Sequence, residues 1–229
     1  MAGAPHILDN PLWASLSTRH RGLALGAGAV LRYPAAIAPF LAVAGRAAVD
    51  AAELEPLVGR NETVYLIGPE PSLPPGWRLT NLGLLAQMVC EQALPEVEGP
   101  SLVPLNDAHR ADVLALTALV YPHYFRPRTM ELGRYFGVLE QGRLAAMIGE
   151  RMGAPGYREI SAVCTHPDFS ARGLARRLLA FLSNDNLRRG ETPFLHVSLE
   201  NERAKSLYER NGYRTRRRVA FFSLCREAG

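Results

Sequence analysis

Residues 162–179 constrain the fold most strongly, because an apolar strand passes there through a short proline-containing loop into a helix. Gly173 opens that helix, and three arginines cluster at its start: Arg172, Arg176 and Arg177. Cations at a helix N-terminus oppose the helix dipole and compete with free backbone N–H groups for an anion. Glycine also lets a ligand approach the backbone closely. The pattern predicts a phosphate-binding helix start, and therefore a phosphorylated cofactor.

The helix after Gly173 is amphipathic. Leu174, Leu178 and Leu182 recur on one face, whereas Arg177 and Asn184 lie on the opposite one. We expect the leucine face to pack against a sheet and the other face to meet solvent.

The chain divides near residues 93–100, where two prolines and a glycine are typical of a linker. Before it, we expect strands at 23–31, 38–43 and 62–67, with a short helix at 50–57. After it, the patterns predict the order strand, two helices, three strands, helix, strand, helix, strand. The runs 22–43 and 62–67 suggest a reduced copy of part of this pattern, but no period is clean enough to indicate a repeat.

Charge and cysteine content narrow the classes of function. The net charge of +4 suits an anionic cofactor as well as nucleic acid, but the basic run 214–218 favours a strand with one solvated face.

The three cysteines, Cys90, Cys164 and Cys225, are far apart in apolar runs, which predicts free thiols in a reducing compartment and no zinc site. Signal-peptide and membrane-span patterns are missing. We therefore expect a cytoplasmic protein with no metal, no nucleic-acid partner and no membrane contact.

Two separated motifs resemble the GNAT superfamily of N-acetyltransferases. Ser170-Ala-Arg-Gly-Leu-Ala175 is similar to its pyrophosphate motif Arg/Gln-x-x-Gly-x-Gly/Ala, with Ser170 in place of the leading Arg or Gln. Residues 201–213 are similar to its signature Asn-x-x-Ala-x-x-Leu-Tyr-x-x-x-Gly-Phe/Tyr. The resemblance covers about residues 101–229 and is similar to one bacterial branch, in which a short N-terminal region precedes the catalytic domain.

The resemblance implies an α/β (α+β) fold with a mixed, mostly antiparallel central sheet flanked by helices. It implies an accessory α/β region at 1–98, with a reduced GNAT-like half as one alternative, and the acetyltransferase domain at 99–229. It also implies acetyl-CoA as cosubstrate. The residues then expected to bind coenzyme A are Val163, Cys164, Thr165, Ala171, Arg172, Gly173, Leu174, Ala175, Arg176, Asn201 and Ala204.

The resemblance further implies direct acetyl transfer to a primary amine of a small molecule or peptide, by a monomer or homodimer. Tyr208 is expected to protonate the departing thiolate, because the pKa of a phenol lies near that of an alkyl thiol. Glu159 is the predicted base, with His123 as the alternative. The acceptor is expected to meet His123, Tyr124 and Phe125.

The sequence is also compatible with two alternatives, one for the mechanism and one for the function. Cys164 suggests a covalent acyl-enzyme, although a cysteine in an apolar strand without a placed histidine is usually part of the core. The same fold also suits a non-catalytic acyl-CoA sensor or interaction protein.

Overall fold

The computed structural model describes residues 5–227, and its central feature is an eight-stranded sheet in the order β3-β10-β4-β9-β8-β7-β6-β5. Neighbouring strands run antiparallel, except for the parallel pair β8 and β9. The predicted mixed, mostly antiparallel sheet is therefore confirmed. The strands span β3 Thr63–Ile67, β4 Trp77–Val89, β5 Val103–Leu105, β6 Tyr135–Glu140, β7 Arg143–Ala154, β8 Tyr157–Thr165, β9 Thr192–Ser198 and β10 Arg214–Arg226.

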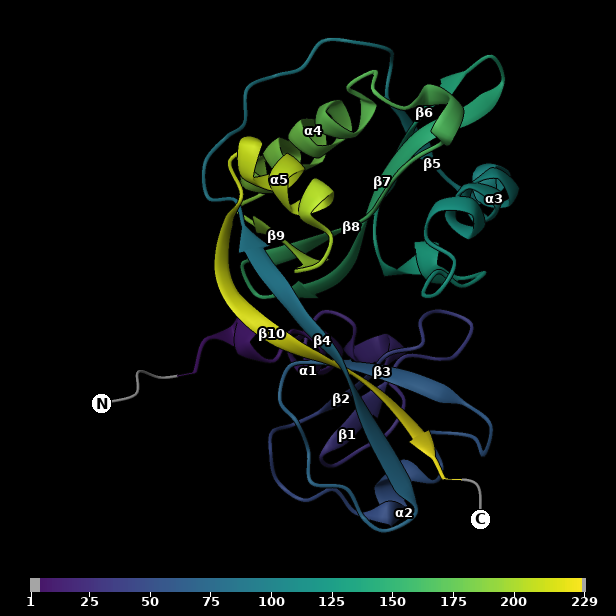
Figure 1. The fold of residues 1–229 in the computed structure, drawn as a ribbon, viewed down its shortest axis with the longest axis vertical. Helices are drawn as coiled ribbons and strands as arrows, with labels where there is room; N and C mark the ends of the chain where they lie inside the picture. Colours follow the sequence, from purple (N-terminus) through teal and green to yellow (C-terminus); the bar gives the residue numbers. More distant parts are fainter. Residues whose placement is uncertain (1–4, 228–229) are drawn as a thin grey trace.

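Two long strands, β4 and β10, connect the upper and lower parts of the molecule (Figure 1). The lower part also holds the two-stranded sheet of β1 (Val30–Arg32) and β2 (Leu41–Val43). β4 precedes residues 93–100 in the chain, yet it lies between β9 and β10, which both follow them. The sheet is thus built from both halves, and the division into domains at 98/99 stays a prediction.

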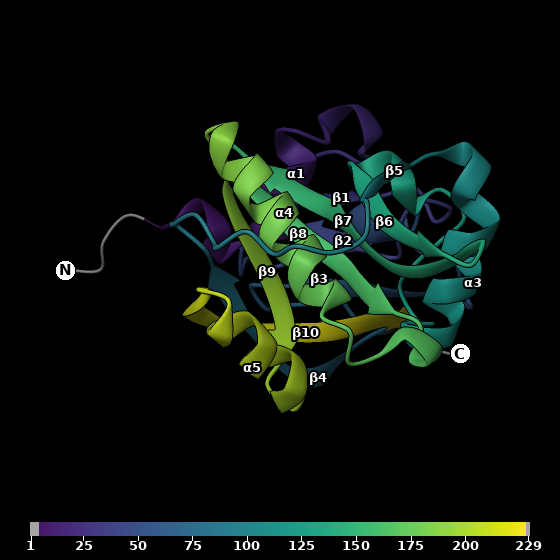
Figure 2. The same ribbon diagram turned by 90° about the horizontal axis from the view of Figure 1, so that it is seen from above.

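Helices cover both faces of the sheet, and Figure 2 shows α4 lying along β8 and β9. Ala146 and Ile148 of β7 share a cluster with α4, whereas Met147, between them, packs in the cluster of α3. This alternation follows from the two-residue period of a strand. The helices are α1 Pro11–Ser17, α2 Ala51–Leu54, α3 Arg110–Val120, α4 Leu174–Arg188 and α5 Glu202–Arg210, with 3₁₀ turns at Ile7–Asp9, Arg21–Leu23, Asp107–His109, Thr129–Leu132 and Pro167–Phe169.

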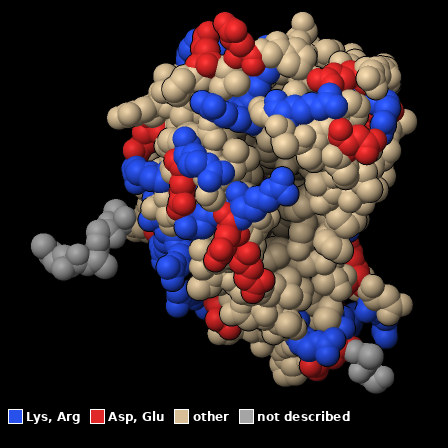
Figure 3. Space-filling view, turned by 45° about the horizontal axis from the view of Figure 1, so that its top comes forward, with Lys and Arg blue, Asp and Glu red and all other residues tan. Residues whose placement is uncertain are grey.

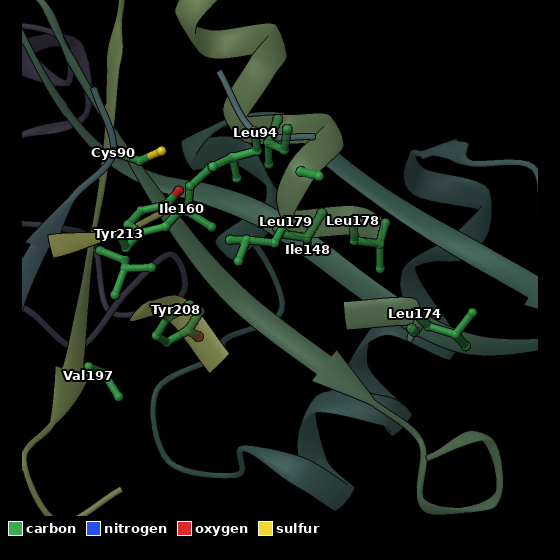
Figure 4. Packing of buried hydrophobic residues seen from close by; sticks show 14 of the residues in the cluster. Cys90, Leu94, Ile148, Ile160, Leu174, Leu178, Leu179, Val197, Tyr208 and Tyr213 are labelled. Atoms are coloured by element: carbon green, nitrogen blue, oxygen red, sulfur yellow. The ribbon is translucent and has the colours of Figure 1, made fainter. Parts of the chain in front are cut away.

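The leucine face of α4 packs on the sheet as predicted. Leu174 and Leu178 join Ile148, Ile160 and Tyr208 in one buried cluster (Figure 4). Burying each such side chain stabilises the fold by about 1.5–3 kcal/mol. This cluster fixes α4 and α5 against the two central strands.

The opposite face of α4 differs from the prediction, because residues 93–100 lie against it. The side-chain amide of Asn184 is buried, accepts from Leu94 N at 2.7 Å and donates to Leu94 O at 2.9 Å. Arg177 donates from Nε to Pro100 O at 2.9 Å. The segment expected to be a linker is therefore held in place by polar side chains of α4.

The basic run 214–218 lies on β10 and is largely ion-paired. Arg214 pairs with Glu91 at 2.6 Å, and Arg216 and Arg217 both pair with Asp9. On the face drawn in Figure 3, basic and acidic side chains are interspersed. Within residues 5–227, no helix is long and apolar enough to cross a membrane.

Candidate active site

The strands β8 and β9 separate part way along their length. They pair only from Tyr157 to Glu159, opposite Thr192 to Phe194. On its other edge, β9 pairs with Leu85–Val89 of β4. Residues 160–165 of β8 thus keep one edge free of strand pairing, and a ligand with amide groups can pair there as an added strand would.

A β-bulge lies in the free part of β8. Cys164 pairs with Met147 and Ser161 with Gly149, so two residues of β8, Ala162 and Val163, stand opposite a single residue of β7. Ala162 has φ 50°, a conformation that costs a non-glycine residue of order 1–3 kcal/mol. The bulge interrupts the ladder and re-aims backbone groups at the open edge. The predicted positions Val163, Cys164 and Thr165 lie here.

A cavity of about 510 Å³ occupies the opening between the two strands. One part of its wall is backbone and side chains of β8, and another comes from the start of α5. A third part is apolar and aromatic, from segments far apart in sequence. The lining residues are Phe40, Ile67, Leu82, Leu85, Val120, Tyr121, Tyr124, Arg151, Ile160, Ser161, Ala162, Val163, Cys164, His196, Val197, Ser198, Asn201, Ala204, Tyr208 and Phe221.

The loop before α4 has the backbone conformation of an anion site. Ala171 and Gly173 have φ 62° and 76°, and Gly173 is the N-cap of the helix. Within the described chain, the N–H groups of residues 171–176 have no backbone acceptor. Such unpaired N–H groups at a helix start suit a phosphate.

The three arginines at this helix start differ in their partners. Arg172 pairs with Glu140 at 2.9 Å, and Arg177 binds the carbonyls of residues 97 and 100. Among the described residues, no ion-pair partner is found for Arg176. Arg176 is therefore the arginine available to a ligand anion, with Leu174 and Ala175 contributing backbone.

The residues present fit coenzyme A. Besides the unpaired N–H groups at α4 and the free edge of β8, the Oγ1 of Thr165 is buried and has no hydrogen-bond partner within residues 5–227. A buried hydroxyl without a partner is costly. Thr165 is not among the described residues that line the cavity, so the fit to coenzyme A rests on the N–H groups at the start of α4 and on the free edge of β8.

Tyr208 projects from α5 into the cavity. Asn201 caps this helix by accepting from Ala204 N at 3.0 Å, which fixes where the helix begins. Tyr208 is 9% exposed, and burial raises the pKa of its phenol. The phenol therefore stays protonated, and it is a weaker acid than an unperturbed phenol, whose pKa lies near that of an alkyl thiol. Figure 4 shows it in the cluster with Val197 and Tyr213.

Cys164 lines the same cavity, but its thiol is a poor nucleophile. It is 2% exposed, and burial raises the pKa of the thiol to about 12. The reactive form is the thiolate, which is scarce at neutral pH with that pKa. The geometry therefore favours direct transfer over an acyl-enzyme on Cys164.

Glu159 lies behind the cavity and is fully buried. Its two oxygens accept from Nε and Nη2 of Arg151, both at 2.7 Å, and one also bonds Nδ1 of His196 at 2.7 Å. Burial alone would raise its pKa, but the charge and hydrogen bonds of Arg151, with the bond from His196, lower the pKa to about 2. This environment argues against the predicted base and for a role in holding Arg151 and His196.

Both ring nitrogens of His196 have hydrogen-bond partners. Nε2 of Gln87 donates to Leu8 O at 2.8 Å, and Oε1 of Gln87 accepts from Nε of Arg216 at 2.7 Å, so the orientation of this amide is fixed. The Gln87 amide then donates to Nε2 of His196 at 3.0 Å. His196 therefore carries its proton on Nδ1, toward Glu159, and its remaining lone pair is occupied.

Of the predicted acceptor residues, the structure brings Tyr124 to the cavity. Its ring packs on Phe40 and Phe221, at centroid distances of 5.9 and 5.8 Å. His123 is exposed and outside the lining, and Phe125 packs against Tyr135.

Sequence reasoning missed Arg151, His196, Phe40 and Phe221. The one available signal was the charged pair Glu150-Arg151 inside the otherwise apolar run 144–154. The other three reach the cavity through strand order, which the sequence pattern does not specify.

Three comparisons place the chain among known proteins. The family model described as FR47-like protein matches residues 135–222. No curated protein matches. A solved structure from Novosphingobium aromaticivorans, described as an acetyltransferase from the GNAT family, is 36% identical, with a TM-score of 0.89 over 98% of this chain and 100% of that one.

Two more distant structures share the fold. A GCN5-related N-acetyltransferase from Kribbella flavida is 17% identical, with a TM-score of 0.56 over 93% of this chain and 94% of that one. A GNAT-family acetyltransferase from Colwellia psychrerythraea is 15% identical, with a TM-score of 0.53 over 63% of this chain and 57% of that one.

Proposed function

Because this chain belongs to the GNAT family of acetyltransferases, we propose that it transfers the acetyl group of acetyl-CoA directly to a primary amine. The observation that carries the proposal is the free, bulged edge of β8 facing Tyr208 across one cavity. That arrangement offers an edge for an amide-bearing ligand and a proton donor beside it.

Residues at three places would hold the cosubstrate. The N–H groups at the start of α4, with Arg176, suit the pyrophosphate. The β8 residues Val163, Cys164 and Thr165 suit the amides of the pantetheine arm. Bound acetyl-CoA would supply the acetyl group as a reactive thioester.

The chain's own residues contribute positioning and one proton. The N–H groups of the backbone at the bulge would stabilise the negative charge that develops on the thioester oxygen. Tyr208 holds the proton that the sulfur takes as the carbon–sulfur bond breaks and the carbon–nitrogen bond forms. The products are an N-acetylated amine and the free thiol of coenzyme A.

The attacking amine loses one proton to solvent, and the Tyr208 phenolate takes one proton back from solvent, so the proton balance closes over one turnover. Among the described residues that line the cavity there is no carboxylate, and the lone pair of His196 is occupied. The acceptor therefore reacts as the free amine, and the rate rises with pH up to the pKa of that amine.

A thiol-release assay with acetyl-CoA and pooled amines tests the proposal, with acetylated products identified by mass. Release that depends on an amine, and a matching acetylated product, are the expected result. Tight binding of coenzyme A without turnover across the pools would contradict it and favour an acyl-CoA sensor.

A further inference from the structure

We propose that the acceptor is an amino acid-like molecule with an apolar body, and that Arg151 binds its carboxylate. This inference rests on the proposed function and names the substrate class of the same site. It is carried by the position of Arg151, by the charge of the cavity and by the nature of its walls.

Arg151 has an unused hydrogen-bonding edge. A guanidinium carries five N–H donors, and Glu159 occupies the edge formed by Nε and Nη2. In the described part of the chain, Nη1 has no protein acceptor, and it is not among the partnerless atoms sealed from solvent. Arg151 lines the cavity, so its second edge is open to a ligand there.

That second edge matches a carboxylate. The fork of Nη1 and Nη2 can donate two parallel hydrogen bonds to a planar carboxylate, as the first edge does to Glu159. The guanidinium of Arg151 is already fixed in an orientation that suits carboxylate binding. Glu159 binds it from one side, and the centroid of the Phe40 ring lies 4.8 Å from its Cζ. The ligand therefore meets a donor pair that is already oriented.

The charge of the cavity selects against other amines. Of the lining residues, all within 5–227, Arg151 alone carries a formal charge. A polyamine or a lysine-rich peptide would bring positive charges that no described lining residue can pair, because Glu159 is bound to Arg151 and lies outside the lining. A molecule with one amine and one carboxylate instead brings an anionic group that Arg151 can bind.

The walls around Arg151 favour an apolar body. Phe40, Tyr124 and Phe221 form an aromatic group beside it. At the mouth, Leu82 and Val120 line the cavity and stay 46% and 40% exposed. Covering these side chains with an apolar acceptor removes them from water.

Arg151 is also close to the free, bulged part of β8, where the thioester is proposed to bind. Its neighbour Glu150 pairs with Ile160, at the point where β8 leaves β9 and shortly before the bulge at Ala162. A carboxylate held by Arg151 thus places an attached amine on the side of the cavity formed by free β8. The residue is a binding group for the acceptor rather than a proton carrier.

Matched substrate pairs test the proposal in the wild-type protein. Thiol release from acetyl-CoA is compared for phenylalanine, phenylalanine amide and phenethylamine, and for 4-(aminomethyl)benzoate and benzylamine, with spermidine as the polycation. We expect the carboxylates to have kcat/KM on the order of 10- to 100-fold higher than their partners, as charge-assisted hydrogen bonds imply.

Binding of an unreactive carboxylate gives a readout that does not depend on turnover. Hydrocinnamate and hydrocinnamamide are titrated by calorimetry into the protein, and only hydrocinnamate is expected to bind. The variant R151M/E159Q removes both charges of the pair, so neither is left buried alone, and should lose this binding while still binding acetyl-CoA.

R134M/E150Q is the matched control. It removes the neighbouring ion pair of β7, Arg134 with Glu150 at 2.6 Å, whose residues lie outside the cavity lining. Hydrocinnamate binding and the preference for carboxylates should both survive in it.

The outcomes separate the two proposals. If phenethylamine or phenylalanine amide is acetylated as well as phenylalanine, the carboxylate site is wrong while the acetyltransferase stands. If no amine is acetylated, but hydrocinnamate binds the wild type and not R151M/E159Q, the proposed function is wrong and the carboxylate site stands. Equal hydrocinnamate binding by R151M/E159Q and the wild type overturns the role of Arg151.

Discussion

Arg151 of β7 and Glu159 of β8 form a two-fold hydrogen-bonded ion pair, at 2.7 Å for both contacts, with Glu159 fully buried behind the cavity. The pairing explains two properties of the site. It keeps the Glu159 carboxylate ionised and out of reach of an acceptor, and it fixes Arg151 so that one face borders the cavity.

Replacing Glu159 by glutamine should destabilise the protein by about 3 kcal/mol, because Arg151 would stay buried without a counterion. Urea unfolding at pH 7 measures this. Glu150→Gln is the control and should cost less, because its partner Arg134 also contacts Asp185. Equal costs for the two variants would contradict the special role of the Arg151 pair.

Tyr208→Phe should lower kcat on the order of 100-fold while the Kd for acetyl-CoA stays unchanged, because only the proton donor is lost. Stopped-flow thiol release and calorimetry measure the two quantities. Tyr213→Phe serves as control, since its hydroxyl bonds Ser183 at 2.7 Å inside the core. A kcat loss of the same size in both variants would indicate a structural effect.

Gly173→Ala should weaken binding of coenzyme A several-fold. Its φ of 76° is unfavourable for alanine by about 1 kcal/mol, and no atom lies within 4 Å of the added methyl. Gly142 has φ 72° and equally open surroundings at a hairpin turn, so Gly142→Ala carries the same strain away from the site. Both variants should lose similar stability, and only Gly173→Ala should lose affinity. An unchanged Kd in Gly173→Ala would contradict the anion site.

The stability of the protein should fall as the pH decreases from 6.5 to 4. Burial lowers the pKa of His20 to about 4, so between these pH values the unfolded chain binds a proton that the folded one does not. The resulting loss is about 3 kcal/mol, fully developed below pH 4. Chemical unfolding across this range measures it.

His20→Gln should remove most of that pH dependence, whereas the exposed His123→Gln should keep it. Below pH 4.5 a further loss begins, because the lowered pKa of Glu159 stabilises the fold only while the carboxylate is ionised. A flat profile between pH 6.5 and 4.5 in the wild type would contradict the burial of neutral His20.

The part of the site proposed to bind coenzyme A, at the starts of α4 and α5, could be predicted from local sequence. Gly173 before an amphipathic helix specifies a helix start with unpaired N–H groups, and Asn201 specifies the cap that positions Tyr208. Short-range signals of this kind depend on a few neighbouring residues. They predicted the helices α4 and α5, and the structure agrees. The mixed, mostly antiparallel sheet was expected from the family resemblance, and the structure confirms it.

The part of the cavity proposed to bind the acceptor could not be predicted in this way. Its residues are brought together by the order of the strands in the sheet, which local sequence patterns do not encode. Phe40 and Phe221 come from opposite ends of the chain, yet both line the cavity. Glu159 looks like an exposed carboxylate in sequence, because nothing there shows that Arg151, eight residues earlier, faces it across the hairpin. The base predicted from a strand carboxylate was for that reason not found at the cavity.

Transfer of a labelled acetyl group in a single turnover distinguishes direct transfer to the amine from an acyl-enzyme. Protein is mixed with acetyl-CoA labelled in the acetyl group and the best amine from the pooled assay, and then quenched over time. We expect the label to appear on the amine at the rate of thiol release, with none on the protein. Label on Cys164, or label released as acetate with the amine unmodified, would contradict it.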